Sequence, residues 1–388
     1  MTRTRVLVAG LGDAGLLTAI HLAKDPALEV VGISSQPGLV SGQELGIRLA
    51  RPEEWVRDYW LPFDRFRGLD GVRTVHGVLE SLDPDRHVVL VSTADGEQHE
   101  EPYDHLVIAT GVRNGFWRTP TLRDAAAVAA SLREPHERLA QADRIAVIGG
   151  GAAAVATAAN LAARWPAKRI DLHFPGDRAL PQHHPRTWST VEGRLRRLGV
   201  GLHPGHRAVV PESAEGAGGA DVPEGADAIT TGPVRFVAGG EAPADAVVWA
   251  IGRVRPNSGW LPADLLDDQG FVPTDRHLRV PGATNVWAIG DVAAPEGDPL
   301  RATARNRADT LLARNIAAAV HGRPLGSYRP AARRWGSVLG VQDDGLQVFT
   351  PGGRAFRFPA WTIRTVLQPL IVRRGIYGGV RGDGPTLG

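Results

Sequence analysis

The stretch Val6-Leu7-Val8-Ala9-Gly10-Leu11-Gly12-Asp13-Ala14-Gly15 decides the fold. Its apolar run, residues 6–9, predicts a buried parallel strand, and the apolar run 16–23 that follows predicts a helix. The glycines between them have the spacing of a dinucleotide-binding turn: Gly10 permits the tight turn, Gly12 admits a pyrophosphate, and Gly15 lets the helix approach the strand. We therefore expect this turn to bind a dinucleotide through Gly10, Gly12, Asp13, Ala14 and Gly15.

The same pattern occurs again in the middle of the chain. Residues 144–148 predict a strand, residues 155–164 an alanine-rich helix, and residues 170–174 the next strand. Two such turns in one chain predict two dinucleotides, and a facing pair suggests electron transfer between a nicotinamide and a flavin. Ala154 fills the last position of the second turn, where only a small residue is needed. The candidate binding residues of this turn are Gly149, Gly150, Gly151, Ala152 and Ala153.

Three further strands end in turns that suit a nucleotide. Residues 103–108 lead into Ala109-Thr110-Gly111, residues 284–289 lead into Gly290-Asp291, and residues 245–251 end at Gly252. A carboxylate at the carboxyl end of a strand, such as that of Asp291, can accept hydrogen bonds from ribityl hydroxyls. Gly290 permits the close approach that this contact needs.

Together these segments resemble a known family. The sequences YDHLVIATG, DAVVWAIGRVRPN and TNVWAIGDVAA, with the two glycine turns, are similar to the pyridine nucleotide-disulfide oxidoreductase superfamily. Among its cysteine-free members the chain resembles the apoptosis-inducing-factor-like and type II NADH dehydrogenase-like flavoproteins, over most of residues 4–320. The resemblance implies an α/β fold with two Rossmann-like domains of the three-layer ββα type. It also implies FAD at the first turn and at Asp291, NAD(P)H at the second turn, and hydride transfer to the flavin before a second acceptor reoxidises it.

The order of the motifs predicts the domain layout. Residues 1–118 and 243–325 should form the FAD-binding domain, with the NAD(P)H-binding domain, 119–242, inserted in it, and a small α+β region at 326–388. The aromatic-rich stretch 40–70 predicts a helical excursion in which most aromatics pack in the core.

Two strand ends depart from the family pattern. The strand at residues 29–33 ends in Ser34-Ser35, whose hydroxyls bind a ribose less strongly than the usual acid. The corresponding strand in the nicotinamide half ends at Phe174, without the acid that selects NADH. Arg178 lies nearby in the sequence and could meet a 2′-phosphate. We therefore favour NADPH over NADH and keep both open.

Two helices also lack family residues. Ala156 and Asn160 occupy positions where relatives carry glutamates near the nicotinamide, so direct reduction of the flavin by a substrate stays open as an alternative. In the helix after Asp291, quinone-reducing relatives carry glutamines. This chain has Ala302 and Asn306 at those positions, with three arginines interleaved. Arginines near a flavin would stabilise an anionic reduced form or an acidic substrate, although a solvated helix face explains them equally well. The candidate catalytic residues on the acceptor side are Arg301, Arg305 and Asn306.

Composition excludes several classes of chemistry. The chain has no cysteine, which excludes disulfides, thiolate-bound metals and a CxxC redox pair. His183-His184 lies between prolines and lacks a spaced third ligand, so we expect no metal site. The net charge of +2 gives no reason to expect a nucleic-acid partner. No apolar run reaches 18 residues, so a spanning helix is not expected and the default compartment is the cytoplasm.

The C-terminal region predicts short strands followed by a helix over residues 361–374. This helix is apolar with arginines at its edges, so it could lie on an anionic membrane surface. We favour packing in the core or in a homodimer over membrane contact, because Pro369 interrupts the pattern.

The most consistent function is an FAD-dependent NAD(P)H oxidoreductase that reduces a small acceptor such as a quinone or a related aromatic. One alternative is a tailoring oxidoreductase that acts on a specialised metabolite with little or no use of nicotinamide. A third interpretation, from another class, is a flavoprotein redox sensor without turnover.

Overall fold

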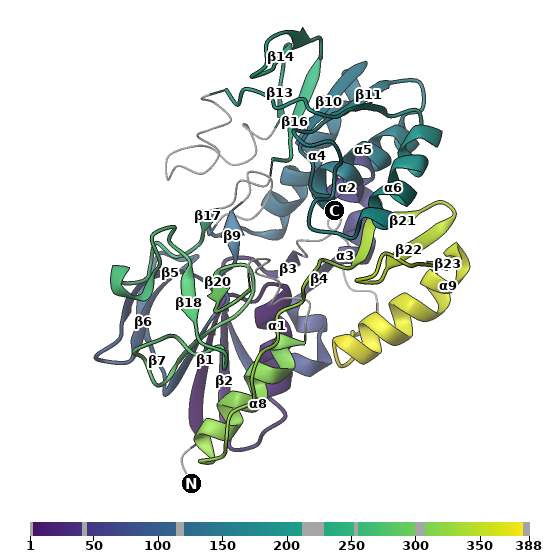
Figure 1. Ribbon diagram of the computed structural model, residues 1–388. Coiled ribbons are helices and arrows are strands. Elements are labelled where there is room, and N and C mark those ends of the chain that lie inside the picture. The colour runs from purple at the N-terminus through teal and green to yellow at the C-terminus, as the bar shows by residue number, and fades with distance from the viewer. Residues whose placement is uncertain are drawn as a thin grey trace.

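The chain folds around two separate sheets, one in the lower and one in the upper part of Figure 1. The computed structural model describes residues 3–40, 45–113, 120–211, 229–251, 255–298 and 307–382. The predicted α/β class is confirmed, because each sheet has a parallel centre covered by helices on one face.

The first sheet has seven strands and begins with the apolar run that opens the sequence. Its parallel part is buried on both faces, as the continuous run of apolar residues requires: Val6 and Leu7 are both fully buried. Strand β5 (Val72–Asp83) pairs parallel with β2 (Leu28–Ser34) over residues 72–76 and antiparallel with β6 (Val88–Thr93) over residues 77–83. One long strand therefore joins the parallel and the antiparallel parts of the sheet. In spatial order the strands are β19 (Val286–Ala288), β8 (His105–Ile108), β1 (Thr4–Ala9), β2 (Leu28–Ser34), β5 (Val72–Asp83), β6 (Val88–Thr93) and β7 (Gln98–Pro102).

Helices cover one face of this sheet and β-structure covers the other. Helices α1 (Asp13–Leu22) and α8 (Ala308–Val320) pack together on the face that includes Val6 and Val8. The opposite face packs against β6 and the pair β18 (Val272–Thr274) and β20 (Ala293–Pro295). This is the expected three-layer ββα arrangement.

The second sheet has five strands, of which the first four are parallel. In spatial order they are β12 (Gly201–His203), β11 (Arg169–His173), β10 (Arg144–Ile148), β16 (Ala246–Trp249) and the antiparallel β13 (Ile229–Thr230). The helices on one face are α4 (Ala125–Gln141), α5 (Ala152–Arg164) and α6 (Pro185–Arg197). The hairpin of β14 (Val234–Arg235) and β15 (Glu241–Ala242) lies on the other face.

The second sheet is inserted in the first along the chain, because its strands lie between β8 and β19 in sequence. The two passes between the sheets pair with each other as β9 (Val112–Arg113) and β17 (Arg255–Pro256). The predicted inserted architecture is therefore confirmed.

The aromatic-rich excursion is helical, and most of its aromatics are buried as expected. Trp55, Trp60 and Phe66 expose 5 % or less of their surface. Helix α2 (Leu45–Ala50) lies directly against α5 of the second sheet. A Cβ on Gly46 of α2 would be 2.4 Å from the carbonyl oxygen of Ala156 on α5. The elements are β3 (Gly38–Val40), α2 (Leu45–Ala50), α3 (Pro52–Tyr59), β4 (Trp60–Pro62) and two short 3-10 turns, Phe63–Arg65 and Arg67–Leu69.

The C-terminal region consists of a three-stranded antiparallel sheet and a helix, as predicted. The strands are β21 (Gly336–Gln342), β22 (Gly345–Phe349) and β23 (Ala355–Phe358), and α9 (Ala360–Thr362) continues into a π-helix, Ile363–Ile376. This helix, yellow in Figure 1, lies along one side of the molecule. Among the helices that the structure describes, none combines the length and the hydropathy that crossing a bilayer requires.

Candidate functional site

The first glycine turn has the geometry that its sequence predicts. Gly10 has a φ of +101°, and a Cβ there would lie 2.6 Å from the carbonyl oxygen of Ala109 on the neighbouring strand. A Cβ on Gly15 would lie 1.9 Å from the carbonyl oxygen of Gly10, so the helix can begin here only with glycine. A Cβ on Gly12 would touch nothing within 4 Å, which leaves open space above the turn. This is the space that an approaching pyrophosphate needs.

Three predicted turns meet at one edge of the first sheet. Strands β1, β8 and β19 are neighbours, so Gly10, Ala109 and Gly290 follow adjacent carboxyl ends. Gly290 has a φ of +84°, and its Cβ position is 3.2 Å from the Cβ of Ala14 at the start of α1. Asp291, half-buried, directly follows this glycine. In open α/β sheets, ligands bind at this edge.

The turn at Ala109-Thr110-Gly111 is held by reciprocal bonds to the second pass between the sheets. Thr110 Oγ1 donates to the carbonyl oxygen of Asn257 at 2.7 Å, and Asn257 Nδ2 donates to the carbonyl oxygen of Thr110 at 3.0 Å. The Asn257 N–H also donates to the carbonyl of Gly111, whose φ is +67°. The asparagine of the motif GRVRPN therefore fixes the predicted turn.

The end of β2 combines neutral hydroxyls with buried arginines. Ser34 Oγ accepts the N–H of Gln36 at 3.1 Å, and the carbonyl of Ser35 accepts the N–H of Arg123 at 3.0 Å. Burial lowers the pKa of Arg123 to about 10, and burial together with Arg123 lowers the pKa of Arg48. Sequence inspection missed both arginines, because no local motif marks them. They add buried positive charge to a region where we expect a dinucleotide anion.

The second glycine turn repeats the backbone of the first. Gly149 has a φ of +140°, and a Cβ there would lie 2.2 Å from the carbonyl oxygen of Ala250, the residue after β16. Gly151 again faces open space, and Ala152 begins α5. No side chain in the described parts of the chain caps α1 or α5, so their first N–H groups suit an anionic ligand. Both turns thus fit a dinucleotide.

Arg178 lies on a loop that contacts the second turn. The Leu180 N–H donates to the carbonyl of Gly150 at 2.7 Å. The Arg178 guanidinium donates to the carbonyls of Leu180 at 3.0 Å and Pro181 at 3.3 Å, within its own loop. Its expected contact with a 2′-phosphate stays a prediction.

Asn160 joins three segments that are far apart in sequence. It is 1 % exposed, and its Nδ2 donates to the carbonyls of Ala156 at 2.8 Å and Leu339 at 2.9 Å. Its Oδ1 accepts Arg51 Nη2 at 3.0 Å and Gln342 Nε2 at 3.1 Å. All the hydrogen-bonding capacity of the amide is used. The residue that replaces a family glutamate therefore acts as a buried joint between the segment after α2, helix α5 and strand β21.

A polar groove of about 400 Å³ lies beside this joint, between α2, α3, the β21–β22 turn and the C-terminal helix. Sequence inspection did not find it, because its walls come from three distant segments. Its lining mixes both charges, with Arg51, Glu54, Arg57, Asp58, Asp343, Arg364 and Arg373 among the residues.

Some predicted site residues cannot be placed. Gly252, Arg301, Arg305 and Asn306 lie outside the described residues.

Comparison with known proteins agrees with this architecture. The family model of the pyridine nucleotide-disulphide oxidoreductases matches residues 4–319. The chain is 27% identical to the oxidoreductase ptaL of Pestalotiopsis fici, over 95% of this chain and 96% of that protein. It is 26% identical to the demethylphylloquinone reductase NdbB of Synechocystis sp., over 92% of this chain and 93% of that protein.

A solved structure shares the fold at low sequence identity. The sulfide:quinone oxidoreductase of Aquifex aeolicus matches with a TM-score of 0.69 and 18% identity, over 98% of this chain and 93% of that chain. Members of the matched family use FAD and NAD(P)H, and both glycine turns fit such dinucleotides. The chain is a cysteine-free oxidoreductase that belongs to the pyridine nucleotide-disulphide oxidoreductase family.

Proposed function

We propose that the protein transfers hydride from NADPH or NADH to bound FAD and passes the electrons to a small acceptor, a quinone or a related aromatic. One observation carries this proposal: two glycine turns with open space at Gly12 and Gly151 stand on two sheets joined by paired passes. The names of two similar proteins, a demethylphylloquinone reductase and a sulfide:quinone oxidoreductase, support the quinone class.

The proposed FAD site is the edge of the first sheet. Backbone N–H groups at the start of α1 would face the pyrophosphate, and Asp291 would accept hydrogen bonds from the ribityl chain. Bound FAD supplies the capacity to take up hydride and release electrons to an acceptor. The residues assigned to it are Gly10, Gly12, Asp13, Ala14, Gly15, Ser34, Ser35, Ala109, Thr110, Gly111, Gly290 and Asp291. The domain that they define is residues 1–118 and 243–325.

The proposed nicotinamide site is the second turn, in a domain of residues 119–242 that is inserted in the FAD-binding domain. The C-terminal region is residues 326–388. The strand next to it ends at Phe174, which offers no carboxylate to a ribose 2′-hydroxyl. With Arg178 on the adjoining loop, this favours NADPH. The residues assigned to the site are Gly149, Gly150, Gly151, Ala152, Ala153, Arg178 and Gly252.

The residues proposed to contact the acceptor are Arg301, Arg305 and Asn306. The polar groove beside Asn160 is a second candidate for the place where the acceptor enters. Guanidinium groups there would orient the oxygen atoms of an acceptor and stabilise negative charge on them. This assignment rests on the chemistry of the residue types.

We further propose that the C-terminal helix and strand β23 contact an anionic membrane surface, from which an apolar acceptor could enter. Phe356, Trp361, Leu370 and Ile371 are 47 % to 67 % exposed. Residues 345–382 contain six arginines and no Asp or Glu. An apolar face with basic edges suits binding to anionic lipid.

Sedimentation with vesicles tests this contact. We expect the protein to pellet with phosphatidylglycerol vesicles more than with phosphatidylcholine vesicles, and Leu370→Glu to reduce pelleting. Val237→Glu, at an apolar residue 64 % exposed on the hairpin of the second sheet, is the matched control. A dimer in light scattering without pelleting would instead support the homodimer alternative.

The tailoring alternative has one observation in its favour: Ala156 and Asn160 supply no carboxylate, and the amide of Asn160 is fully engaged within the protein. In that alternative a metabolite would reduce the flavin directly.

Anaerobic titration distinguishes these functions. We expect NADPH, and more weakly NADH, to bleach the flavin absorbance of the purified protein, and a quinone to restore it. Bleaching by neither nicotinamide would contradict the reductase. A redox sensor would bleach without sustained turnover.

A further inference from the structure

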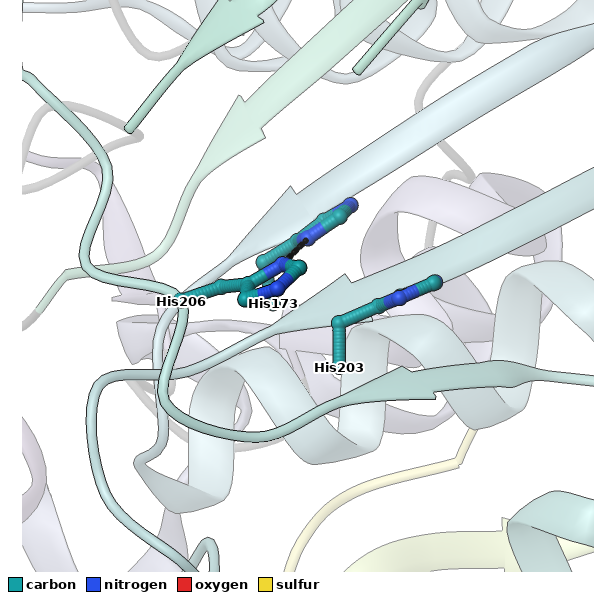
Figure 2. Close-up of side chains that lie close together, drawn as sticks. All are labelled: His173, His203 and His206. Atoms are coloured by element: carbon teal, nitrogen blue, oxygen red, sulfur yellow. Dashed lines mark hydrogen bonds between the residues drawn. The ribbon is translucent and has the colours of Figure 1, made fainter. Parts of the chain in front are cut away.

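Three histidines that neither glycine turn contains meet at the carboxyl ends of two neighbouring strands (Figure 2). His173 ends β11, His203 ends β12, and His206 lies on the turn after β12. One ring nitrogen of each lies within 4.8 Å of those of the other two. The rings of His173 and His203 are stacked with centroids 4.3 Å apart. The Nδ1 atoms of His173 and His206 are 3.2 Å apart.

This cluster is not explained by stability. His173 is 2 % exposed, and its Nε2 has no hydrogen-bond partner among the described residues. A buried polar atom without a partner destabilises the fold.

A carboxylate orients the second histidine. His203 Nε2 lies 2.8 Å from Asp171 Oδ1, and Arg169 Nε holds the other oxygen of Asp171 at 2.7 Å. This bond places the proton on Nε2 and leaves Nδ1 of His203 with its lone pair. Carboxylates orient metal-binding histidines in this way in many proteins.

The surroundings provide an apolar wall and an entrance. The ring of Phe236 lies 5.0 Å from that of His173 and 4.7 Å from that of His206, by centroid. His206 is exposed to solvent, so an ion can reach the cluster from that side.

We propose that His173, His203 and His206 form a site for a divalent transition-metal ion, with Zn²⁺ as the best-matched ion. Three imidazoles and one open position are a common tetrahedral arrangement for zinc. With Zn–N bonds of about 2.0–2.1 Å, two ligand nitrogens lie about 3.4 Å apart, close to the separation between His173 and His206. The three rings lie nearly parallel, with 13° to 19° between their planes, so binding requires the imidazoles to rotate until their lone pairs converge on the ion.

The experiment measures metal binding itself and does not depend on turnover. Tag-free, FAD-loaded protein is stripped with a chelator and titrated with ZnCl₂ in a calorimeter. We expect one Zn²⁺ per chain, and an affinity at least about tenfold weaker in His203→Gln and in His206→Gln. His321→Gln removes a histidine that pairs with Asp25 elsewhere on the surface, and should leave the affinity unchanged.

A second measurement identifies the ligands. X-ray absorption at the zinc edge should show three imidazole nitrogens in the wild-type protein and fewer in His206→Gln. His206 is exposed, so this variant should keep its circular dichroism and its flavin spectrum. Absence of saturable zinc binding would overturn the proposal, and so would equal binding by the wild-type protein and His206→Gln.

Discussion

The two glycine turns share a backbone and differ in their neighbours. In both, the first glycine has a positive φ and lies against a carbonyl of the adjacent strand, at Ala109 and at Ala250. In the first, the neighbouring strand β2 ends in serine hydroxyls near buried arginines; in the second, β11 ends in a histidine of the three-imidazole cluster. The glycine pattern therefore explains the backbone that the two turns share, and the ends of the neighbouring strands are where the two sites differ.

The largest expected effect is a difference between the two turns at their last position, Gly15 in the first and Ala154 in the second. Gly15→Ala would bring a Cβ to 1.9 Å from a backbone oxygen, so we expect no folded, flavin-loaded protein on purification. At the matched position of the second turn, Ala154→Gly should fold and lose only about 1 kcal/mol in the free energy of unfolding, measured with urea. A folded, flavin-loaded Gly15→Ala protein would show that this position accepts a Cβ, and that the two turns do not differ there.

The next comparison separates the two cradles by ligand. Gly12→Ala and Gly151→Ala place a Cβ in open space, so both proteins should fold. We expect Gly12→Ala to lose most of its FAD, measured by absorbance after gel filtration. Gly151→Ala should keep its FAD and raise the KM for nicotinamide about tenfold or more, because the methyl group occupies the space of the pyrophosphate. If Gly151→Ala lost its FAD and Gly12→Ala only raised the KM for nicotinamide, the first turn would be assigned to the nicotinamide and the second to FAD.

Helix α5, which follows the second turn, carries the Asn160 joint. The described residues of α1 show no equivalent of it. Asn160→Ala would remove the four hydrogen bonds of a buried amide, two donated to the carbonyls of Ala156 and Leu339 and two accepted from Arg51 and Gln342. The free energy of unfolding should therefore fall by about 2–3 kcal/mol in urea. Asn285→Ala, which removes exposed contacts of its Nδ2 with the carbonyl of Asp104 at 3.0 Å and with His87 Nε2 at 3.5 Å, is the control and should cost less than about 1 kcal/mol. Equal losses in the two variants would argue against the joint.

The smallest expected effect is acid sensitivity in the first sheet. Burial raises the pKa of Glu101, but the hydrogen bonds and charge of Arg73 outweigh it, so the folded pKa lies below 4.5. A lowered folded pKa gives stability that is present above pH 4.5 and is lost as the pH falls through the folded value.

Glu101→Gln should therefore lower the free energy of unfolding by about 1 kcal/mol at pH 7, a figure reduced because Arg73 is half exposed. The difference from wild type should shrink below pH 4.5, measured by urea unfolding across this range. Glu100→Gln, at an exposed pair with Arg86, should show no measurable change at either pH. A constant difference at all pH values would contradict the linkage.

Local rules allowed the turns and strands to be predicted from the sequence. Gly10 and Gly149 are required by a positive φ and a close carbonyl, and such constraints leave a local pattern. Contacts between distant segments leave no local pattern in the sequence. They determine the Asn160 joint, the burial of Arg48 and the histidine cluster. His173 and His203, for example, meet only because β11 and β12 are neighbours. The role proposed for Arg301, Arg305 and Asn306 stays a prediction.

The anchoring of the two sheets has a mechanical consequence. The two passes between them are bonded to each other at Thr110 and Asn257, and Asn160 on α5 accepts a hydrogen bond from Arg51, which follows α2 in the excursion from the first sheet. Two separated contacts oppose a hinge motion between the sheets. If the nicotinamide and the flavin bind at the two turns as proposed, we expect turnover to be insensitive to solvent viscosity.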